Sequence, residues 1–552
     1  MRIGACLLAF VALAGAPPRV EYIDATEHSR IDFRLENSPT SQKYLPETMG
    51  GGVAVFDYDN DGRLDVFFVN GARIEDPMPV GKQPDKSEPK YWNRLYHQNP
   101  DGTFSEVAEK AGVTGMLQNR YGMGVAVGDY DNDGFEDMYV TGVGGNTLYH
   151  NNGNGTFSDV TAKTGVASSG WGTSAGFFDF DNDGKLDLFV CRYLEWSFAA
   201  NRFCGDHRQG GRSYCHPDNF PAINNVLFHN NGDGTFTDVS AKSGIAVTPG
   251  KSLGVAFADY DGDGWMDMYV ANDSVPCFLF HNNRNGTFSE VGVEAGVAFN
   301  EDGQTFAGMG VDFADYDNDG KPDLVVTDLS NQRYLLYRNN GDGTFSDVTT
   351  NSGLGNATIT YSGWSTRFVD YDNDGQKDVF IAQGHVMDNI NMTSPNLRYF
   401  QPPLLLKNTA GRFATVEGGP GMQKAWAGRG AALGDLDEDG GIDIVVTNIG
   451  QHAYLLSNRG ASQNGWVRVA LKGKHSNRDG IGCRVKAVSG DGLTQFYTVN
   501  TAAGYLSASD KCLLIGLGVS REASLVEITW PSGAKQHFEK IASGKTIQAD
   551  EP

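Results

Sequence analysis

The chain has 552 residues, enough for several ordinary domains or for one large repeat array with a smaller appendage. It carries 44 Lys plus Arg against 68 Asp plus Glu, a formal charge of −24, and this sign argues against nucleic acid and anionic membrane surfaces as partners. Apolar residues make up 40 % and glycines number 71, which excludes a disordered acidic chain and indicates a folded protein with many tight turns.

The first residues have the pattern of an export signal. One positive residue, Arg2, precedes the apolar run from Ile3 to Val11, and Ala12 and Ala14 fit a cleavage site. We therefore expect residues 1–14 to be a signal peptide, with cleavage after Ala16 as the alternative, and the mature protein to be exported to an extracellular or periplasmic location. No later stretch has the ~18 unbroken apolar residues of an integral membrane span.

The cysteines that remain after the signal fit an oxidising compartment, because six is an even number that permits disulfides. Cys204 and Cys215, which lie in one Gly-rich insertion, are the best expected pair. Cys483 and Cys512 are a possible second pair near the C-terminus. The remaining two are Cys191 and Cys277.

A nine-residue pattern, Asp-x-Asp-x-Asp-Gly-x-x-Asp, recurs seven times and organises the chain. A hard divalent cation takes roughly six to eight oxygen ligands, and a loop with carboxylates at alternate positions turns them toward one centre. The glycine at position 6 allows the sharp turn. The pattern predicts up to seven Ca²⁺ sites, since Mg²⁺ dehydrates reluctantly; a merely solvated turn is the alternative for any single copy.

The predicted metal ligands are the aspartates at positions 1, 3, 5 and 9 of each copy. We number the copies loop 1 to loop 7 in chain order. Their ligands are Asp57, Asp59, Asp61 and Asp65; Asp129, Asp131, Asp133 and Asp137; Asp179, Asp181, Asp183 and Asp187; Asp259, Asp261, Asp263 and Asp267; Asp315, Asp317, Asp319 and Asp323; Asp370, Asp372, Asp374 and Asp378; Asp435, Asp437, Asp439 and Asp443.

The residues around each loop predict β-hairpins rather than EF-hands. An EF-hand needs a Glu at position 12, and all seven copies have an apolar residue there, such as Phe68 in loop 1. Apolar runs such as Val53–Phe56 and Val66–Val69 flank the loop and indicate strands buried on both faces. A second hairpin signal follows, with Gly between two apolar runs, as at Leu148–Val160.

Each unit therefore has four antiparallel strands, which is typical of a propeller blade, and seven blades lie within the usual range. The last unit lacks its fourth strand, whereas Tyr22–Thr26 matches that strand in kind. We predict an all-β fold: a seven-bladed β-propeller over residues 20–460, closed by an N-terminal strand, followed by a small β-rich domain over residues 461–552.

The motifs carry a family resemblance. The unit from Gly52 through Asp57–Asp65 to Ala72 resembles the FG-GAP/VCBS repeats of integrin α-subunit propellers and of many bacterial exported proteins, whose loops bind calcium. Four segments look like parts of the ASPIC/UnbV domain: Asn477–Val485, Gly504–Ser507, Ile515–Gly518 and Trp530–Gly533. Together they resemble bacterial members of the cartilage acidic protein family. Cys483 departs from the domain's pattern, and residues 204–219 form a long insertion on which the resemblance is silent.

Residues outside the repeated pattern are candidates for a specific activity. Four of them, Glu47, Trp171, Trp364 and Arg429, are expected at the ring mouth opposite the calcium loops. There they could bind a sugar or peptide, or simply cap the central channel. The other candidates are Arg192, His207, His216, Arg367 and His385.

Two functions remain open from the sequence. The preferred one is a calcium-stabilised propeller that binds extracellular protein or glycan without chemistry. The alternative is a propeller-based carbohydrate-active enzyme of the polysaccharide lyase or dehydratase type. Convergence of His385, Arg367 and a Tyr in one deep cleft would favour the enzyme, and a plugged mouth would disfavour it. No catalytic residue is assigned.

Overall fold

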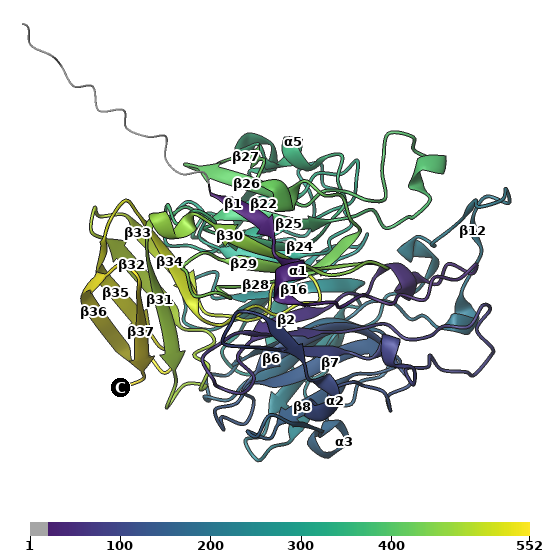
Figure 1. Ribbon diagram of the computed structural model, residues 1–552, viewed down its shortest axis with the longest axis horizontal. Coiled ribbons are helices and arrows are strands. Elements are labelled where there is room, and N and C mark those ends of the chain that lie inside the picture. Colours follow the sequence, from purple (N-terminus) through teal and green to yellow (C-terminus); the bar gives the residue numbers. More distant parts are fainter. Residues whose placement is uncertain (1–19) are drawn as a thin grey trace, which may run out of the picture.

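The computed structural model describes residues 20–552, so the expected signal segment 1–14 lies outside the described residues. The described part is all-β, with antiparallel four-stranded sheets as its main element (Figure 1). Its α-helices are single turns, and none of them is long and apolar enough to cross a membrane. These helices are α1 (Thr26–Ser29), α2 (Ala108–Ala111), α3 (Thr161–Thr164), α4 (Thr349–Ser352) and α5 (Leu354–Thr358).

Within residues 20–552, seven four-stranded sheets each carry one of the acidic loops between their first and second strands, and we number the sheets by their loops. In order from the first strand to the outermost, sheet 1 contains β2 (Val53–Phe56), β3 (Asp65–Phe68), β4 (Arg94–Gln98) and β5 (Phe104–Glu106); sheet 2 contains β6 (Tyr121–Gly128), β7 (Asp137–Val143), β8 (Thr147–Asn151) and β9 (Phe157–Asp159); sheet 3 contains β10 (Gly172–Phe178), β11 (Asp187–Arg192), β14 (Val226–Asn230) and β15 (Phe236–Asp238); sheet 4 contains β16 (Ser252–Ala258), β17 (Asp267–Asn272), β18 (Phe278–Asn282) and β19 (Phe288–Glu290).

The remaining three sheets follow the same order. Sheet 5 contains β20 (Val311–Ala314), β21 (Asp323–Val326), β22 (Leu335–Asn339) and β23 (Phe345–Asp347); sheet 6 contains β24 (Gly363–Val369), β25 (Asp378–Gln383), β26 (Leu404–Thr409) and β27 (Arg412–Val416); sheet 7 contains β28 (Gly428–Gly434), β29 (Asp443–Asn448), β30 (Tyr454–Arg459) and β1 (Glu21–Asp24).

Two parts of this arrangement were predicted. The strands after the loops are buried on both faces, as their continuous apolar runs indicate; every residue of β3 and β21 is buried. The N-terminal strand β1 pairs antiparallel with β30, with Tyr22 opposite Asn458, so the expected fourth strand of the last unit does come from the N-terminus.

Neighbouring sheets are joined by equivalent hydrogen bonds. A side-chain amide near the end of each third strand donates to the carbonyl of loop position 2 in the preceding sheet; Asn151, for example, donates to Tyr58 O at 2.7 Å. The series returns to its start, because Gln98 of sheet 1 donates to Leu436 O of loop 7, also at 2.7 Å. The first strands follow the same order, since β28 lies against β2.

The C-terminal module, residues 465–550, packs at the loop end of the sheets and lies at the opposite side of the molecule from β12 (Figure 1). It consists of two sheets. One has the order β34–β31–β37 and the other β33–β32–β35–β36. Their strands are β31 (Gly465–Lys472), β32 (Arg484–Ser489), β33 (Thr494–Thr498), β34 (Leu513–Gly518), β35 (Glu522–Thr529), β36 (Lys535–Ala542) and β37 (Lys545–Asp550).

One stretch of this module, which we call the central segment (residues 500–510), runs along the first strands of the sheets. Its Leu506 O accepts from Val125 N of sheet 2 at 3.0 Å, and its Ala508 O accepts from Val55 N of sheet 1 at 3.1 Å. Gly504 pairs with Val311 of sheet 5. The central segment therefore fills the space between first strands that belong to sheets far apart in the sequence.

The cysteines follow the sequence prediction in one case and contradict it in the other. Cys204 and Cys215 form a disulfide, which closes the insertion that holds β12 (Cys204–Gly205) and β13 (Arg212–Ser213). Cys483 and Cys512 are both free thiols, so the prediction of a possible second disulfide between them is wrong. Cys483 lies in the apolar core of the C-terminal module, whereas Cys512 lines a cavity between that module and the sheets.

Candidate metal centres

Each loop folds its four aspartates around one centre through hydrogen bonds to its own backbone. In loop 1, Asp57 Oδ1 accepts from Asp61 N at 3.1 Å and Oδ2 accepts from Gly62 N at 2.9 Å. Asp65, the first residue of β3, accepts from Tyr58 N at 3.1 Å and from Gln98 N at 2.9 Å. These bonds hold the position 1 and position 9 carboxylates in place before any ion arrives.

Two backbone positions in each loop are left-handed, and the sequence reasoning identified only one of them. Gly62 has φ +89°, as expected for position 6. Asn60, at position 4, has φ +57°, and its side chain donates to Gly134 O of loop 2 at 2.8 Å. Asn tolerates this conformation better than most residues. The repeated Asn at position 4 was the available signal for a link between neighbouring loops.

A histidine on the third strand lies against the carboxylates of four loops, and the sequence reasoning missed it. In each of these sheets the imidazole Nδ1 lies 3.1 to 3.4 Å from the position 9 carboxylate. The ligand atoms of Asp59, Asp65 and His97 lie within 4.8 Å of one another. The repeated sequence Leu-Tyr/Phe-His before the second turn was the signal. The four are His97, His150, His229 and His281.

The donor atoms of the loops fit a cation. Buried carboxylate oxygens without a hydrogen-bond partner include Asp59 Oδ1, Asp181 Oδ1 and Asp435 Oδ1. Such oxygens are costly unless a positive group meets them. Burial raises the pKa of Asp65 to about 8 and that of Asp187 to about 7, because the carboxylates are desolvated and crowded together. An oxygen-rich, hard donor set of this kind suits Ca²⁺.

These pKa directions predict opposite pH dependences with and without calcium. Between the ordinary Asp pKa of 3.8 and the raised value of about 8 for Asp65, the metal-free folded chain holds protons that the unfolded chain has lost, so its stability falls as pH rises. With millimolar calcium, deprotonation instead favours ion binding, so stability rises with pH. Melting temperatures measured from pH 5 to pH 8 in EDTA and in calcium test this; parallel curves would contradict it.

The C-terminal module covers much of the loop end. Asp479 Oδ2 accepts from Asp129 N of loop 2 at 2.7 Å, and Arg484 Nη1 donates to Asp259 Oδ2 of loop 4 at 2.9 Å. Gly518 N donates to Asn373 O of loop 6 at 2.8 Å. The shape of several loops is thus coupled to the docking of the module.

A cavity of about 430 Å³ lies between the module and sheets 4 to 7. Asp312 and Arg367 form an ion pair there at 3.3 Å, and the Lys377 ammonium lies 4.1 Å from the centroid of the Tyr497 ring. Burial lowers the pKa of Lys377 to about 8. His385 is not among the lining residues, so the convergence of His385 with Arg367 that would favour an enzyme is not found in the part of the chain described.

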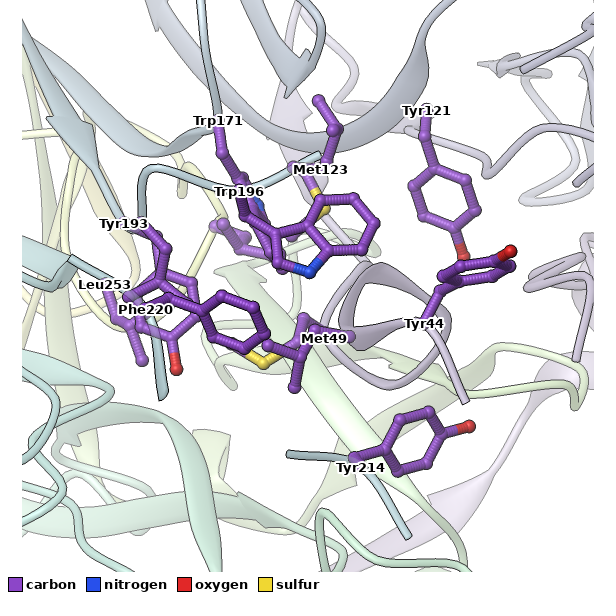
Figure 2. Packing of buried hydrophobic residues seen from close by; sticks show 14 of the residues in the cluster. Tyr44, Met49, Tyr121, Met123, Trp171, Tyr193, Trp196, Tyr214, Phe220 and Leu253 are labelled. Atoms are coloured by element: carbon purple, nitrogen blue, oxygen red, sulfur yellow. The ribbon is translucent and has the colours of Figure 1, made fainter. Parts of the chain in front are cut away.

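The opposite mouth is closed. Trp171, Trp364 and Arg429 are at most 1 % exposed, and the Arg429 guanidinium lies 4.0 Å from the centroid of the Trp364 ring. Figure 2 shows Trp171 and Trp196 packed within the same cluster as Tyr44, Met49 and Phe220. This burial agrees with the interpretation that these residues cap the central channel. It does not agree with an open mouth that binds a sugar.

The other candidates are also placed. Glu47 is fully buried and accepts hydrogen bonds from Thr40 Oγ1 and from the Tyr214 hydroxyl, while desolvation raises its pKa to about 7. His385 accepts from Met387 N through Nδ1. His207 stacks on Phe203 in the disulfide-closed insertion, His216 is exposed, and Arg192 is partly buried at the end of β11.

Comparison with known proteins agrees with the repeat pattern. An FG-GAP-like repeat matches residues 57–140, 129–190, 218–270, 259–326 and 315–381, and an ASPIC and UnbV domain matches residues 473–552. Cartilage acidic protein 1 of Homo sapiens is 25 % identical over 560 residues, covering 98 % of this chain and 76 % of the relative.

Solved structures give weaker likenesses. YCF48 bound to a D1 peptide aligns at a TM-score of 0.41 with 8 % identity, over 82 % of this chain and 99 % of that one. An Agrocybe aegerita lectin that recognises non-reducing terminal N-acetylglucosamine aligns at 0.37 with 17 % identity, over 73 % and 87 %. TM-scores this low carry no argument about function. The family matches identify the family: this chain belongs to the FG-GAP-like repeat proteins with a C-terminal ASPIC and UnbV domain and is homologous to cartilage acidic protein 1.

Proposed function

We propose that this protein is an exported, calcium-binding, seven-bladed β-propeller that acts as a binding or adhesion module for extracellular protein or glycan. The observation that carries the metal part is the repeated loop geometry, in which buried aspartate oxygens converge without a hydrogen-bond partner. The seven sheets are its blades, and the bond from Gln98 to Leu436 O supports closure of the ring. The Cys204–Cys215 disulfide fits an oxidising compartment.

A binding role fits better than catalysis in the channel. The central segment and the aromatic cluster occupy both ends of the space between the first strands. The exposed features lie instead on loops, such as the insertion closed by Cys204 and Cys215, where Phe203 is 46 % exposed beside Arg212. Loops held on a rigid scaffold commonly carry recognition surfaces.

The binding proposal is tested by a screen of glycans and extracellular proteins with the chain in millimolar calcium and in EDTA. We expect a saturable ligand whose binding is lost in EDTA, because the blades that present the loops lose their ions. Turnover of a polysaccharide by the purified chain, with no stable binding partner, would instead favour the lyase or dehydratase alternative.

Asp179→Ala tests one metal site at a time. Asp179 holds loop 3 through Gly184 N and Asp183 N, and its pKa is raised to about 8 by burial, so its loss removes both a ligand and the loop's shape. We expect the calcium count from native mass spectrometry to fall by one. Asp233→Ala is the matched control: Asp233 lies in the turn between β14 and β15 of the same sheet and accepts hydrogen bonds from Thr235, and its loss should leave the count unchanged.

A further inference from the structure

Loop 6 differs from loops 1 to 4 at the third-strand position that faces the carboxylates. This position precedes the Asn or Gln whose backbone N–H donates to the position 9 aspartate, as Asn408 N does to Asp378 Oδ1 at 2.7 Å. It is His in sheets 1 to 4, where neutral imidazole keeps a lone pair that an ion can use. In sheet 6 it is Lys407, whose ammonium has donors and no lone pair.

The Lys407 ammonium lies among the carboxylates of loop 6. Its Nζ is 2.7 Å from Asp372 Oδ1, 2.7 Å from Asp374 Oδ2 and 3.5 Å from Asp378 Oδ1. These are the ligands at positions 3, 5 and 9. The lysine side chain is only 18 % exposed, so its charge is held at the centre rather than in solvent.

Lys and Arg cations in the other loops pair with carboxylates other than the position 9 aspartate; Arg484, for example, reaches Asp259 at position 1 of loop 4. Lys185 pairs with Asp183 at position 5 of loop 3. Arg338, which takes the same third-strand position in sheet 5, pairs with Asp317 and Asp319 at positions 3 and 5 while its side chain is 44 % exposed. Among the described residues, the ion pairs to a position 9 aspartate come from the four histidines and from Lys407 alone. The donor set of loop 6 is therefore already satisfied by a cation.

Loop 6 is also closely enclosed by the C-terminal part of the chain. Asp370 is 8 % exposed, and a Cβ at Gly516 of β34 would lie 2.1 Å from its Oδ2. Gly518 N bonds to Asn373 O, and Asn464 Nδ2 donates to Asp372 O at 2.7 Å. If loop 6 keeps its fold without a metal ion, these contacts also keep the C-terminal module attached to the sheets.

We propose that Lys407 is a built-in cation that replaces the metal in loop 6, so that the chain binds at most six calcium ions and its C-terminal module stays docked without the seventh. This inference rests on the proposed calcium binding of the other loops. It lowers the expected number of calcium ions from seven to six. It also distinguishes loop 6, which attaches the C-terminal module, from the loops that bind calcium.

The test is native mass spectrometry of the full mature chain in calcium, with Lys407→Met and Lys407→His. We expect no more than six ions on the wild type and one more on each variant than on the wild type, because Met removes the ammonium and His restores the donor set of sheets 1 to 4. Lys185→Met, which removes the lysine paired with Asp183, should not change the count. Lys407→His also covers the case in which Lys407→Met fails to fold.

The outcomes separate the two proposals. Seven ions on the wild type, or equal counts on the wild type and Lys407→His with other ions bound, overturns the role of Lys407 and leaves calcium binding intact. No ion on any variant overturns calcium binding as well. A gain of one ion, with a melting temperature that calcium raises more in Lys407→His than in the wild type, supports the proposal.

Discussion

Excess EDTA is expected to lower the melting temperature of this protein by about 10 °C or more relative to millimolar calcium. An ion bound only by the folded chain contributes about 2.7 kcal/mol when its concentration is about one hundred times its Kd, and several ions act together. The position 9 aspartates explain the size of the loss: Asp323 and Asp443 are at most 2 % exposed, and burial holds their pKa values well above the ordinary range.

The control for this melt is the same chain in EDTA with excess magnesium. Magnesium demands a stricter octahedron than the loops supply, so it should restore only part of the loss. Equal melting curves in calcium and in EDTA would show that the carboxylates are protonated or internally paired instead, and would overturn the metal part of the proposed function.

The local part of each metal centre could be predicted from the sequence because its residues are close together in the chain. Asp57 and Asp65 are eight residues apart, and alternate carboxylates with a glycine at position 6 already define a loop around an ion. His97 could not be placed in the same way. It reaches Asp65 only through the register of β4 against β3, across a connection that the repeat pattern does not describe.

The central segment marks the limit of sequence reasoning on the fold. Gly504–Ser507 indicated the C-terminal domain, but nothing local says that these residues pass between the first strands of other sheets. The same holds for Lys407: a lysine after an apolar run reads as a solvated strand end, and only the fold brings it to Asp372 and Asp378. Burial of Trp364 and Arg429 together likewise depends on contacts between distant segments.

The central segment is the basis of the second large prediction, a loss of about 2–5 kcal/mol of stability in Leu506→Ala. The Leu506 side chain is fully buried, and its amide donates to Ser174 Oγ at 2.9 Å while its carbonyl accepts from Val125 N. Shortening the side chain leaves a cavity between strands that cannot close without moving the sheets. Chemical denaturation with calcium present measures the change, and Leu117→Ala, at a leucine that is 88 % exposed, is the matched control.

The same variant shows whether the two parts of the chain unfold together. The Tyr505 hydroxyl donates to Met49 O at 2.8 Å, and Gly504 pairs with Val311, so the central segment connects the C-terminal module to the chain before sheet 1 and to sheet 5. If these contacts join the two parts into one cooperative unit, Leu506→Ala should weaken that coupling. The C-terminal module of the variant should then become susceptible to protease at temperatures where the sheets remain folded. Gly504→Ala should act in the same direction, because Gly504 has φ +77° and an added Cβ would lie 2.3 Å from Ser365 Oγ. Wild-type stability and protease resistance in both variants would mean that the central segment fills the channel without holding the module in place.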